Sequence, residues 1–201
     1  LLNEQTSVML ASYKRVVNKV CSARFSTAIT TKNFINGEFK DSKATKWFNI
    51  YNPATQELVN KVPQTTNEEF QEAVNSAQEA FKTWKEVPIL VRQRYMFDYL
   101  IKLKENHEEL AKAITREQGK TLIDARGDVQ RGMEVVEHCL SFASVMMGET
   151  SENISKNIDL YSYRVPLGVC AGIAPFNFPV MIPLWMFPVG ITCGNTYILK
   201  P

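Results

Sequence analysis

Two polar side chains stand in or beside an otherwise uncharged part of the sequence and are the first candidates for chemistry. No charged residue occurs between Val165 and Leu199, yet Asn177 lies inside the apolar run GIAPFNFPVMIPLW, and Lys200 follows directly after Leu199. Asparagine offers an amide that donates and accepts hydrogen bonds, and lysine offers an ammonium donor. These residue types indicate a binding or catalytic edge, but their spacing alone does not identify the ligand.

The elements around these two residues predict a βαβ unit. The expected order is strand (168–173), tight loop (174–178), helix from about Pro179, turn (Gly194 and Asn195) and strand (196–199). Both strands lack polar alternation, which is typical of parallel strands buried on two faces. Ligands of such sheets bind beyond the carboxyl ends of the strands, where Asn177 and Lys200 both fall.

A membrane span is the alternative explanation of this run, because thirty-five uncharged residues are long enough to cross a bilayer. Five prolines and four glycines within the run would repeatedly interrupt a spanning helix. No basic cluster flanks the run as the positive-inside rule requires. We therefore expect no membrane association from this segment.

Composition excludes other classes of function. The 201 residues are 45% hydrophobic and carry a net charge of +2, without the basic excess typical of nucleic-acid binding. The four cysteines show no CxxC spacing and are accompanied by only two histidines. We expect reduced, buried thiols, with neither a metal site nor a disulfide framework.

Residues 1–32 form a separate segment. No acidic residue occurs between Glu4 and Glu38, while five basic residues and several serines do. This composition is typical of a mitochondrial transit peptide that is cleaved before about Thr31, and it predicts the matrix as the location. A disordered basic tail is the alternative.

The remaining chain predicts strands, then helices, then a strand. Asn36-Gly37 and Asn52-Pro53 punctuate a small β-meander over residues 33–62. Thr66 and Glu69 form a capping box that opens a helix, whose expected inward stripe begins at Phe70. A second helical pattern follows Pro88 and is broken near Asn106. A third begins near Lys120, and its Val129 and Val136 are expected to face inward. Residues 151–164 predict an exposed antiparallel strand with a bulge where the apolar phase slips.

The sequence resembles the aldehyde dehydrogenase superfamily. The likeness rests on GIAPFNFP, CGNTYILKP and REQGKTLIDARGDVQRGMEVVEHC, covers roughly residues 34–201, and is strongest to its CoA-acylating mitochondrial semialdehyde dehydrogenases. It implies an α/β fragment: helices and β-hairpins (33–150), an oligomerisation strand (151–165) and the first βαβ unit (166–201) of an atypical Rossmann domain. The atypical mode agrees with the absence of a GxGxxG fingerprint.

The resemblance also implies residue roles. Asn177 corresponds to the oxyanion-hole asparagine of the family, Lys200 to the lysine that binds the ribose hydroxyls of NAD, and Ala174 and Phe176 to the wall beside the nicotinamide. Most of the superfamily has Trp where this chain has Phe176. The nucleophilic cysteine, the general-base glutamate and a second ribose-binding acid are expected after Pro201.

The implied substrate is a small semialdehyde with a carboxylate. It would be oxidised with NAD, and the resulting acyl group would be transferred to CoA. Arg131 is the expected carboxylate-binding residue, with Arg126 on the same helix as its competitor. Two alternatives remain: a hydrolytic aldehyde dehydrogenase that does not use CoA, and a truncated chain that only assembles with intact subunits. The complete enzyme is expected to be a homotetramer.

Overall fold

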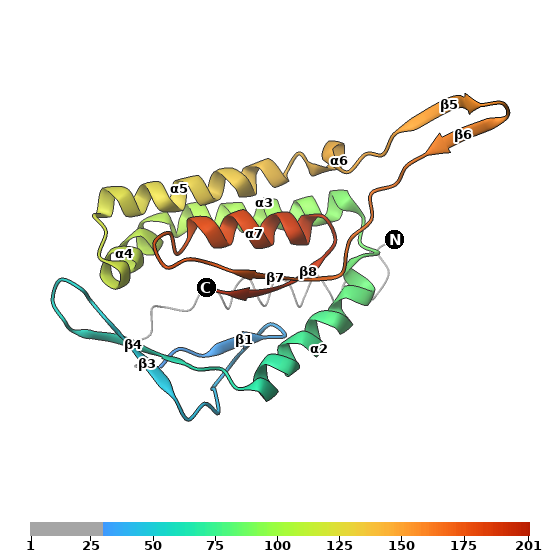
Figure 1. Ribbon diagram of the computed structural model, residues 1–201. Coiled ribbons are helices and arrows are strands. Elements are labelled where there is room, and N and C mark those ends of the chain that lie inside the picture. The colour runs from blue at the N-terminus through green and yellow to red at the C-terminus, as the bar shows by residue number, and fades with distance from the viewer. Residues whose placement is uncertain (1–29) are drawn as a thin grey trace. The chain divides into compact units, whose positions relative to one another are not determined.

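The computed structural model describes residues 30–201, so the predicted targeting segment lies almost entirely outside the described residues. The chain divides into two compact units. The first extends to Ser76 and includes Lys102–Arg126, and the second consists of Ala77–Ile101 and Gly127–Pro201. Helices and strands occur in both (Figure 1).

Two antiparallel hairpins belong to the first unit. Their strands are β1 (Asn33–Ile35), β2 (Glu38–Lys40), β3 (Trp47–Tyr51) and β4 (Leu58–Pro63). Asn36 and Gly37 connect β1 to β2 with φ angles of 54° and 73°, the left-handed pair that a type I′ turn requires. The hairpins form two separate sheets, so the prediction of one continuous meander is wrong.

The segment between β2 and β3 bonds to a residue of the next helix. Ser42 Oγ donates to Glu69 Oε2 at 3.0 Å, and the amide of Lys43 donates to Glu69 Oε1 at 2.8 Å. These bonds hold the segment against the start of a helix.

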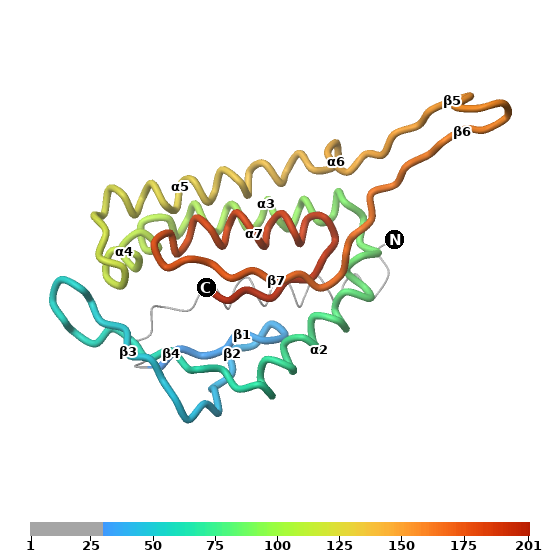
Figure 2. The backbone as a smooth tube through the Cα atoms, viewed as in Figure 1, coloured from blue at the N-terminus to red at the C-terminus, as the bar shows by residue number. Residues whose placement is uncertain are grey.

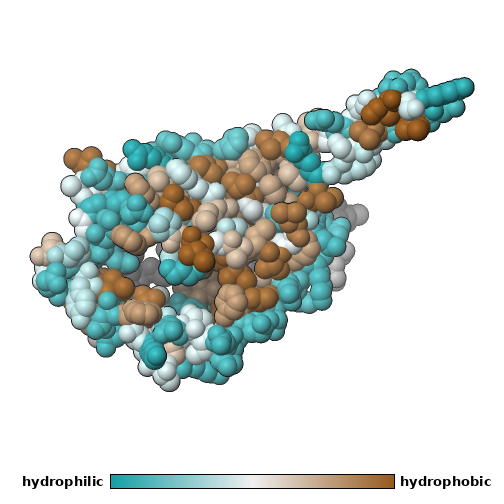
Figure 3. Space-filling model, viewed as in Figure 1, coloured by the Kyte–Doolittle hydropathy of each residue, from teal (hydrophilic) through white to brown (hydrophobic). Residues whose placement is uncertain are grey.

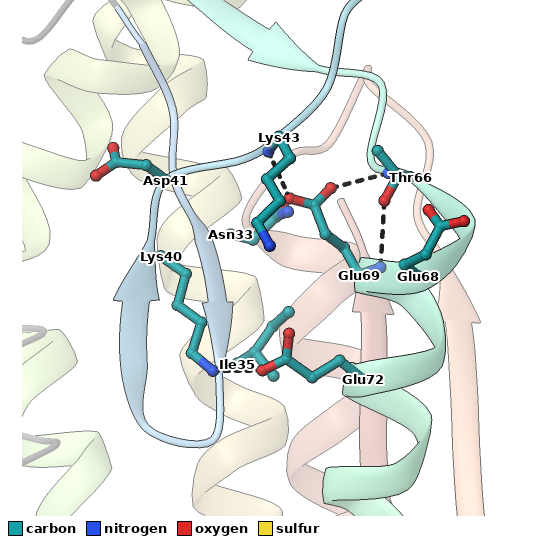
Figure 4. Close-up of a pocket in the computed structure, with 9 residues that line it drawn as sticks. All are labelled: Asn33, Ile35, Lys40, Asp41, Lys43, Thr66, Glu68, Glu69 and Glu72. Atoms are coloured by element: carbon teal, nitrogen blue, oxygen red, sulfur yellow. Dashed lines mark hydrogen bonds and ion pairs between the residues drawn. The ribbon is translucent and has the colours of Figure 1, made fainter.

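That helix, α2 (Asn67–Trp84), begins with the predicted capping box. The amide of Thr66 donates to Glu69 Oε2 at 2.9 Å, and the amide of Glu69 donates to Thr66 Oγ1 at 3.3 Å (Figure 4). Reciprocal bonds of this kind satisfy donors that have no partner inside a helix. The predicted inward stripe does not form a buried face. Phe70 is 54% exposed, and no residue of α2 is fully buried.

Helices α3 (Ile89–Glu105) and α4 (His107–Gln118) are separated at Asn106, as predicted. Gly119 ends α4 in the left-handed region, with a φ of 87°, and its amide donates to the carbonyl of Thr115 at 3.1 Å. A glycine adopts this conformation without the steric cost of a Cβ atom.

Helix α5 (Leu122–Cys139) is followed by the short α6 (Phe142–Val145). Val129 and Val136 are fully buried, which confirms the predicted inward face of α5. In the second unit, Gln93 of α3 donates to the carbonyl of Leu140, just after α5, at 2.5 Å.

A hairpin of β5 (Thr150–Ser155) and β6 (Ile158–Tyr161) extends away from α6 (Figure 1). Every residue of both strands is exposed, and apolar side chains lie on its surface (Figure 3). The predicted exposed, antiparallel character is confirmed. The irregularity lies in β5, between Ser151 and Ser155, rather than at the predicted phase slip.

The predicted βαβ unit is present as β7 (Val169–Ile173), α7 (Met181–Thr192) and β8 (Thr196–Lys200), as the tube trace in Figure 2 shows. The strands pair in parallel, with Ile173 opposite Lys200. No helix in the described part of the chain is long and apolar enough to cross a membrane.

Only one face of β7 is buried, so the expectation of strands covered on both sides is wrong for this strand. Gly172 faces α7: a Cβ atom built there would lie 3.1 Å from the sulfur of Met186. The alternate residues Val169, Ala171 and Ile173 are exposed. The reason is that α7 covers a single side of this two-stranded sheet, whereas a doubly wound sheet has helices on both sides.

Candidate active site

The ends of β7 and β8 bring Ala174 and Lys200 together. The amide of Ala174 donates to the carbonyl oxygen of Lys200 at 2.9 Å, which extends the strand ladder by one residue. Ala174 is buried, whereas Lys200 is exposed and its side chain donates to the carbonyl of Pro201 at 2.5 Å. An ammonium group therefore lies at the carboxyl edge of the sheet, where ligands of such folds bind.

Phe176 and Asn177 lie in the turn between β7 and α7, and both are exposed. The phenyl ring of Phe176 is 85% exposed and offers an open aromatic surface at this edge. Helix α7 begins at Met181, two residues after the predicted start at Pro179. Asn177 therefore lies three residues beyond Ala174 and four before the helix.

One buried acid on α5 meets the end of this loop. Asp128 Oδ1 accepts a hydrogen bond of 2.7 Å from the amide of Met181, and Asp128 is only 1% exposed. Sequence reasoning missed this residue. The available signal was an acid placed among the inward-facing positions of α5, three residues after Ala125 and beside Val129.

The two candidate arginines on α5 differ in their surroundings. Arg126 Nε and Nη2 each donate to Glu108 at 2.8 Å, and this hydrogen-bonded pair raises the pKa of the Arg126 guanidinium. Arg131 is exposed, and its side chain forms no ion pair with any residue that the structure describes. Its carbonyl accepts a hydrogen bond of 3.2 Å from Nε1 of Trp185 on α7. Arg131 is therefore the candidate whose guanidinium is not already committed to a carboxylate.

Two of the three described cysteines, Cys139 and Cys193, do not have the properties of a catalytic nucleophile. Cys139 is fully buried, and burial raises the pKa of its thiol to about 11. Burial also raises the pKa of Cys193, which caps the far end of α7. A nucleophilic cysteine needs an accessible thiolate near neutral pH, so neither thiol is suited to that role.

A cavity of about 550 Å³ in the first unit is lined by none of the predicted site residues. Lys40 and Glu72 form an ion pair at its wall, and the capping residues Thr66 and Glu69 also line it (Figure 4). Thr66 and Glu69 bond to each other at the start of α2, and Glu72 of α2 pairs with Lys40. These contacts within the chain explain why the polar side chains gather here.

Residues 39–201 match the aldehyde dehydrogenase family. The chain belongs to this family and has its mixed helix-and-strand fold.

The individual relatives have a more specific name. The chain is 55% identical over 181 residues to the mitochondrial, acylating methylmalonate-semialdehyde/malonate-semialdehyde dehydrogenase of Homo sapiens, an alignment that covers 90% of this chain and 34% of that protein. Methylmalonate-semialdehyde dehydrogenase from Oceanimonas doudoroffii has a similar structure, with a TM-score of 0.82 and 42% identity over 86% of this chain and 35% of that one.

A third relative contains the cofactor. A Sinorhizobium meliloti 1021 protein, provisionally named methylmalonate-semialdehyde dehydrogenase, was crystallised with NAD. It matches with a TM-score of 0.84 and 40% identity, over 88% of this chain and 36% of that one. The chain thus spans about one third of the length of the relatives it matches.

Proposed function

We propose that this chain is the N-terminal part of an NAD-dependent, CoA-acylating oxidoreductase. Its substrates would be methylmalonate and malonate semialdehydes, and its products propionyl-CoA and acetyl-CoA, with loss of carbon dioxide. The observation that carries the proposal is the exposed Asn177 loop at the carboxyl end of β7, beside the end of β8 that bears Lys200. The names of the similar proteins support the choice of substrate.

Asn177 would stabilise the transition state. Negative charge develops on the aldehyde oxygen when a thiolate attacks the carbonyl carbon, and the side-chain amide of Asn177 can donate a hydrogen bond to that oxygen. Loss of one such donor typically raises the barrier by about 3 kcal/mol. A turn residue that bonds only its own backbone is the structural alternative.

Three residues at the carboxyl edge suit NAD. The exposed ammonium group of Lys200 can donate to ribose hydroxyls, and the open ring of Phe176 beside Ala174 offers an apolar surface for a nicotinamide. When bound, NAD accepts the hydride that leaves the substrate carbon. These residues would therefore bind and orient the cofactor rather than transfer protons.

Arg131 would hold the carboxylate of the substrate. A guanidinium binds a carboxylate through two parallel hydrogen bonds, which also fixes its orientation. The support is that Arg126, the competing residue, already forms such a pair with Glu108. The nucleophilic cysteine, the general-base glutamate and the second ribose-binding acid would come from the chain after Pro201.

The complete protein is proposed to act in the mitochondrial matrix as a homotetramer. The relative from Homo sapiens is named mitochondrial, and residues 1–32 have the composition of a transit peptide. Residues 33–150 and 166–201 would be parts of the NAD-binding domain, and the exposed apolar hairpin within residues 151–165 would mediate assembly.

An assay of the full-length protein with methylmalonate semialdehyde and NAD, with and without CoA, tests the proposal. Propionyl-CoA formed in step with NADH, and little turnover without CoA, is the expected result. A free acid formed at the same rate without CoA would instead indicate a hydrolytic aldehyde dehydrogenase.

A non-catalytic role in assembly is the second candidate, favoured by the exposed hairpin. In that case the 201-residue chain would co-purify with intact subunits while contributing no activity. A transcript that ends near the codon for Pro201 would support this candidate, and a coding sequence that continues in frame would exclude it.

A further inference from the structure

Asp128 is a buried acid that accepts a hydrogen bond from the backbone at the start of α7. A carboxylate removed from water is costly unless hydrogen bonds compensate for the lost hydration. Asp128 Oδ1 accepts the amide of Met181 at 2.7 Å, and this amide belongs to the first residue of α7. The first amides of a helix have no partner inside it, and their positive dipole favours an acceptor there.

The loop that carries Asn177 is therefore held at both ends. At its start, the amide of Ala174 bonds to the carbonyl of Lys200, and at its end, the amide of Met181 bonds to Asp128. Only residues 175–180 lie between these two anchors. The backbone on either side of Asn177 is thus tied to β8 and to α5.

Two further contacts set the position of α7 against α5. A Cβ atom at Gly132 would lie 2.6 Å from Cδ1 of Leu184 and 3.3 Å from Cα of Met181, so the glycine permits close approach. Trp185 Nε1 donates to the carbonyl of Arg131 at 3.2 Å. Asp128 is the member of this group that bonds to the backbone at the end of the loop.

We propose that Asp128 is a positioning residue for the oxyanion hole: by anchoring the amide of Met181, it fixes the loop so that the side-chain amide of Asn177 points at the reacting oxygen. This inference rests on the proposed function. Oxyanion stabilisation depends on donors held in place before the reaction, and a displacement of about 1 Å can cost about a hundredfold in rate.

Kinetics of the full-length enzyme test this role. Asp128→Ala is expected to lower kcat by about tenfold to a hundredfold with little change in KM for NAD. Asp128→Asn keeps one acceptor oxygen and should lose less. Glu134→Gln, which alters an exposed acid on the same helix, should match the wild type. Equal losses in Asp128→Asn and Asp128→Ala would overturn the role of the acceptor oxygen.

A double-mutant cycle distinguishes positioning from a general loss of structure. If Asp128 acts through Asn177, adding Asp128→Asn to Asn177→Ala should lower kcat no further, because the donor that Asp128 orients is already absent. A full additional loss in the double variant would show that Asp128 acts independently of Asn177 and would overturn the proposal.

Hydrogen exchange provides a readout that does not require aldehyde turnover. In the full-length protein, Asp128→Asn and Asp128→Ala should speed exchange in peptides that cover residues 174–182, while peptides from α4 remain unchanged. If the wild type does not oxidise semialdehydes but this local effect is present, the proposed function fails and the anchoring stands. Unchanged exchange in both variants would overturn the anchoring itself.

Discussion

The amide of Ala174 and the carbonyl of Lys200 are joined by a 2.9 Å hydrogen bond, although the two residues lie 26 positions apart in the chain. This bond places the start of the Asn177 loop beside the end of β8. A residue proposed to stabilise the reacting oxygen and one proposed to bind the cofactor therefore depend on the same strand pair.

Lys200→Ala in the full-length enzyme should raise KM for NAD and change kcat much less. The reason is that ribose binding is shared by the ground state and the transition state. Initial rates over a range of NAD concentrations measure this. Lys82→Ala, an exposed lysine of α2, is the matched control, and an equal rise in its KM would refute a specific role for Lys200.

Asn177→Ala should show the opposite pattern. We expect kcat to fall by about a hundredfold or more, with KM for NAD nearly unchanged, because the lost donor acts mainly in the transition state. Asn75→Ala removes an exposed amide from α2 and serves as control. A modest fall in kcat together with a large rise in KM would mean that Asn177 binds rather than catalyses.

Arg131→Leu should separate two substrates. We expect kcat/KM for methylmalonate semialdehyde to fall by about tenfold to a hundredfold, the usual value of one charged hydrogen-bonding partner. Propanal lacks the carboxylate and should be oxidised as before. Arg126→Leu, which breaks the pair with Glu108, is the control. It should not change the ratio of kcat/KM for methylmalonate semialdehyde to that for propanal. Parallel losses for both substrates in Arg131→Leu would indicate a structural role.

Two glycine-to-alanine changes should have opposite effects on the free energy of unfolding. At Gly119 the φ is +87°, and a Cβ atom would lie 2.4 Å from Cγ of Pro53, so Gly119→Ala should destabilise by more than about 1 kcal/mol. A Cβ atom built at Gly127, inside α5, would meet no atom within 4 Å apart from the backbone of its own helix. Gly127→Ala should therefore stabilise the fold by up to about 1 kcal/mol. Urea unfolding of the full-length variants measures both, and a stabilised Gly119→Ala would contradict the described turn.

The thiol of Cys139 should make stability fall at alkaline pH. In the folded protein its pKa is about 11, compared with an ordinary value of 9.0. Between these values the unfolded state binds fewer protons, so the free energy of unfolding decreases as pH rises. The stabilising contribution of the neutral thiol is fully present below pH 9. Cys139→Ala should reduce the slope of stability against pH over this range, and an unchanged slope would exclude Cys139 as its source.

Features governed by neighbouring residues were predictable from the sequence. The capping box of Thr66 and Glu69 and the turn at Asn36 and Gly37 depend on residues within four positions of one another. The alternation of strand, loop and helix around Asn177 was recognisable for the same reason. These local signals located both the loop and the end of β8.

Features that depend on distant partners were not predictable. Asp128 and Met181 are 53 positions apart, and no local pattern indicates that an acid on one helix meets the first amide of another. Likewise, Glu69 serves both its own helix and the segment around Ser42. Nothing in the periodicity of the strands reveals this second use.

The uncovered side of β7 has a practical consequence for preparing the chain by itself. Val169, Ala171 and Ile173 present an apolar strip on one face of a two-stranded sheet, and exposed apolar patches favour aggregation. Residues 1–201 expressed alone should bind hydrophobic dyes and precipitate as the concentration rises, whereas a Thr substitution at Ile173 should raise the soluble yield.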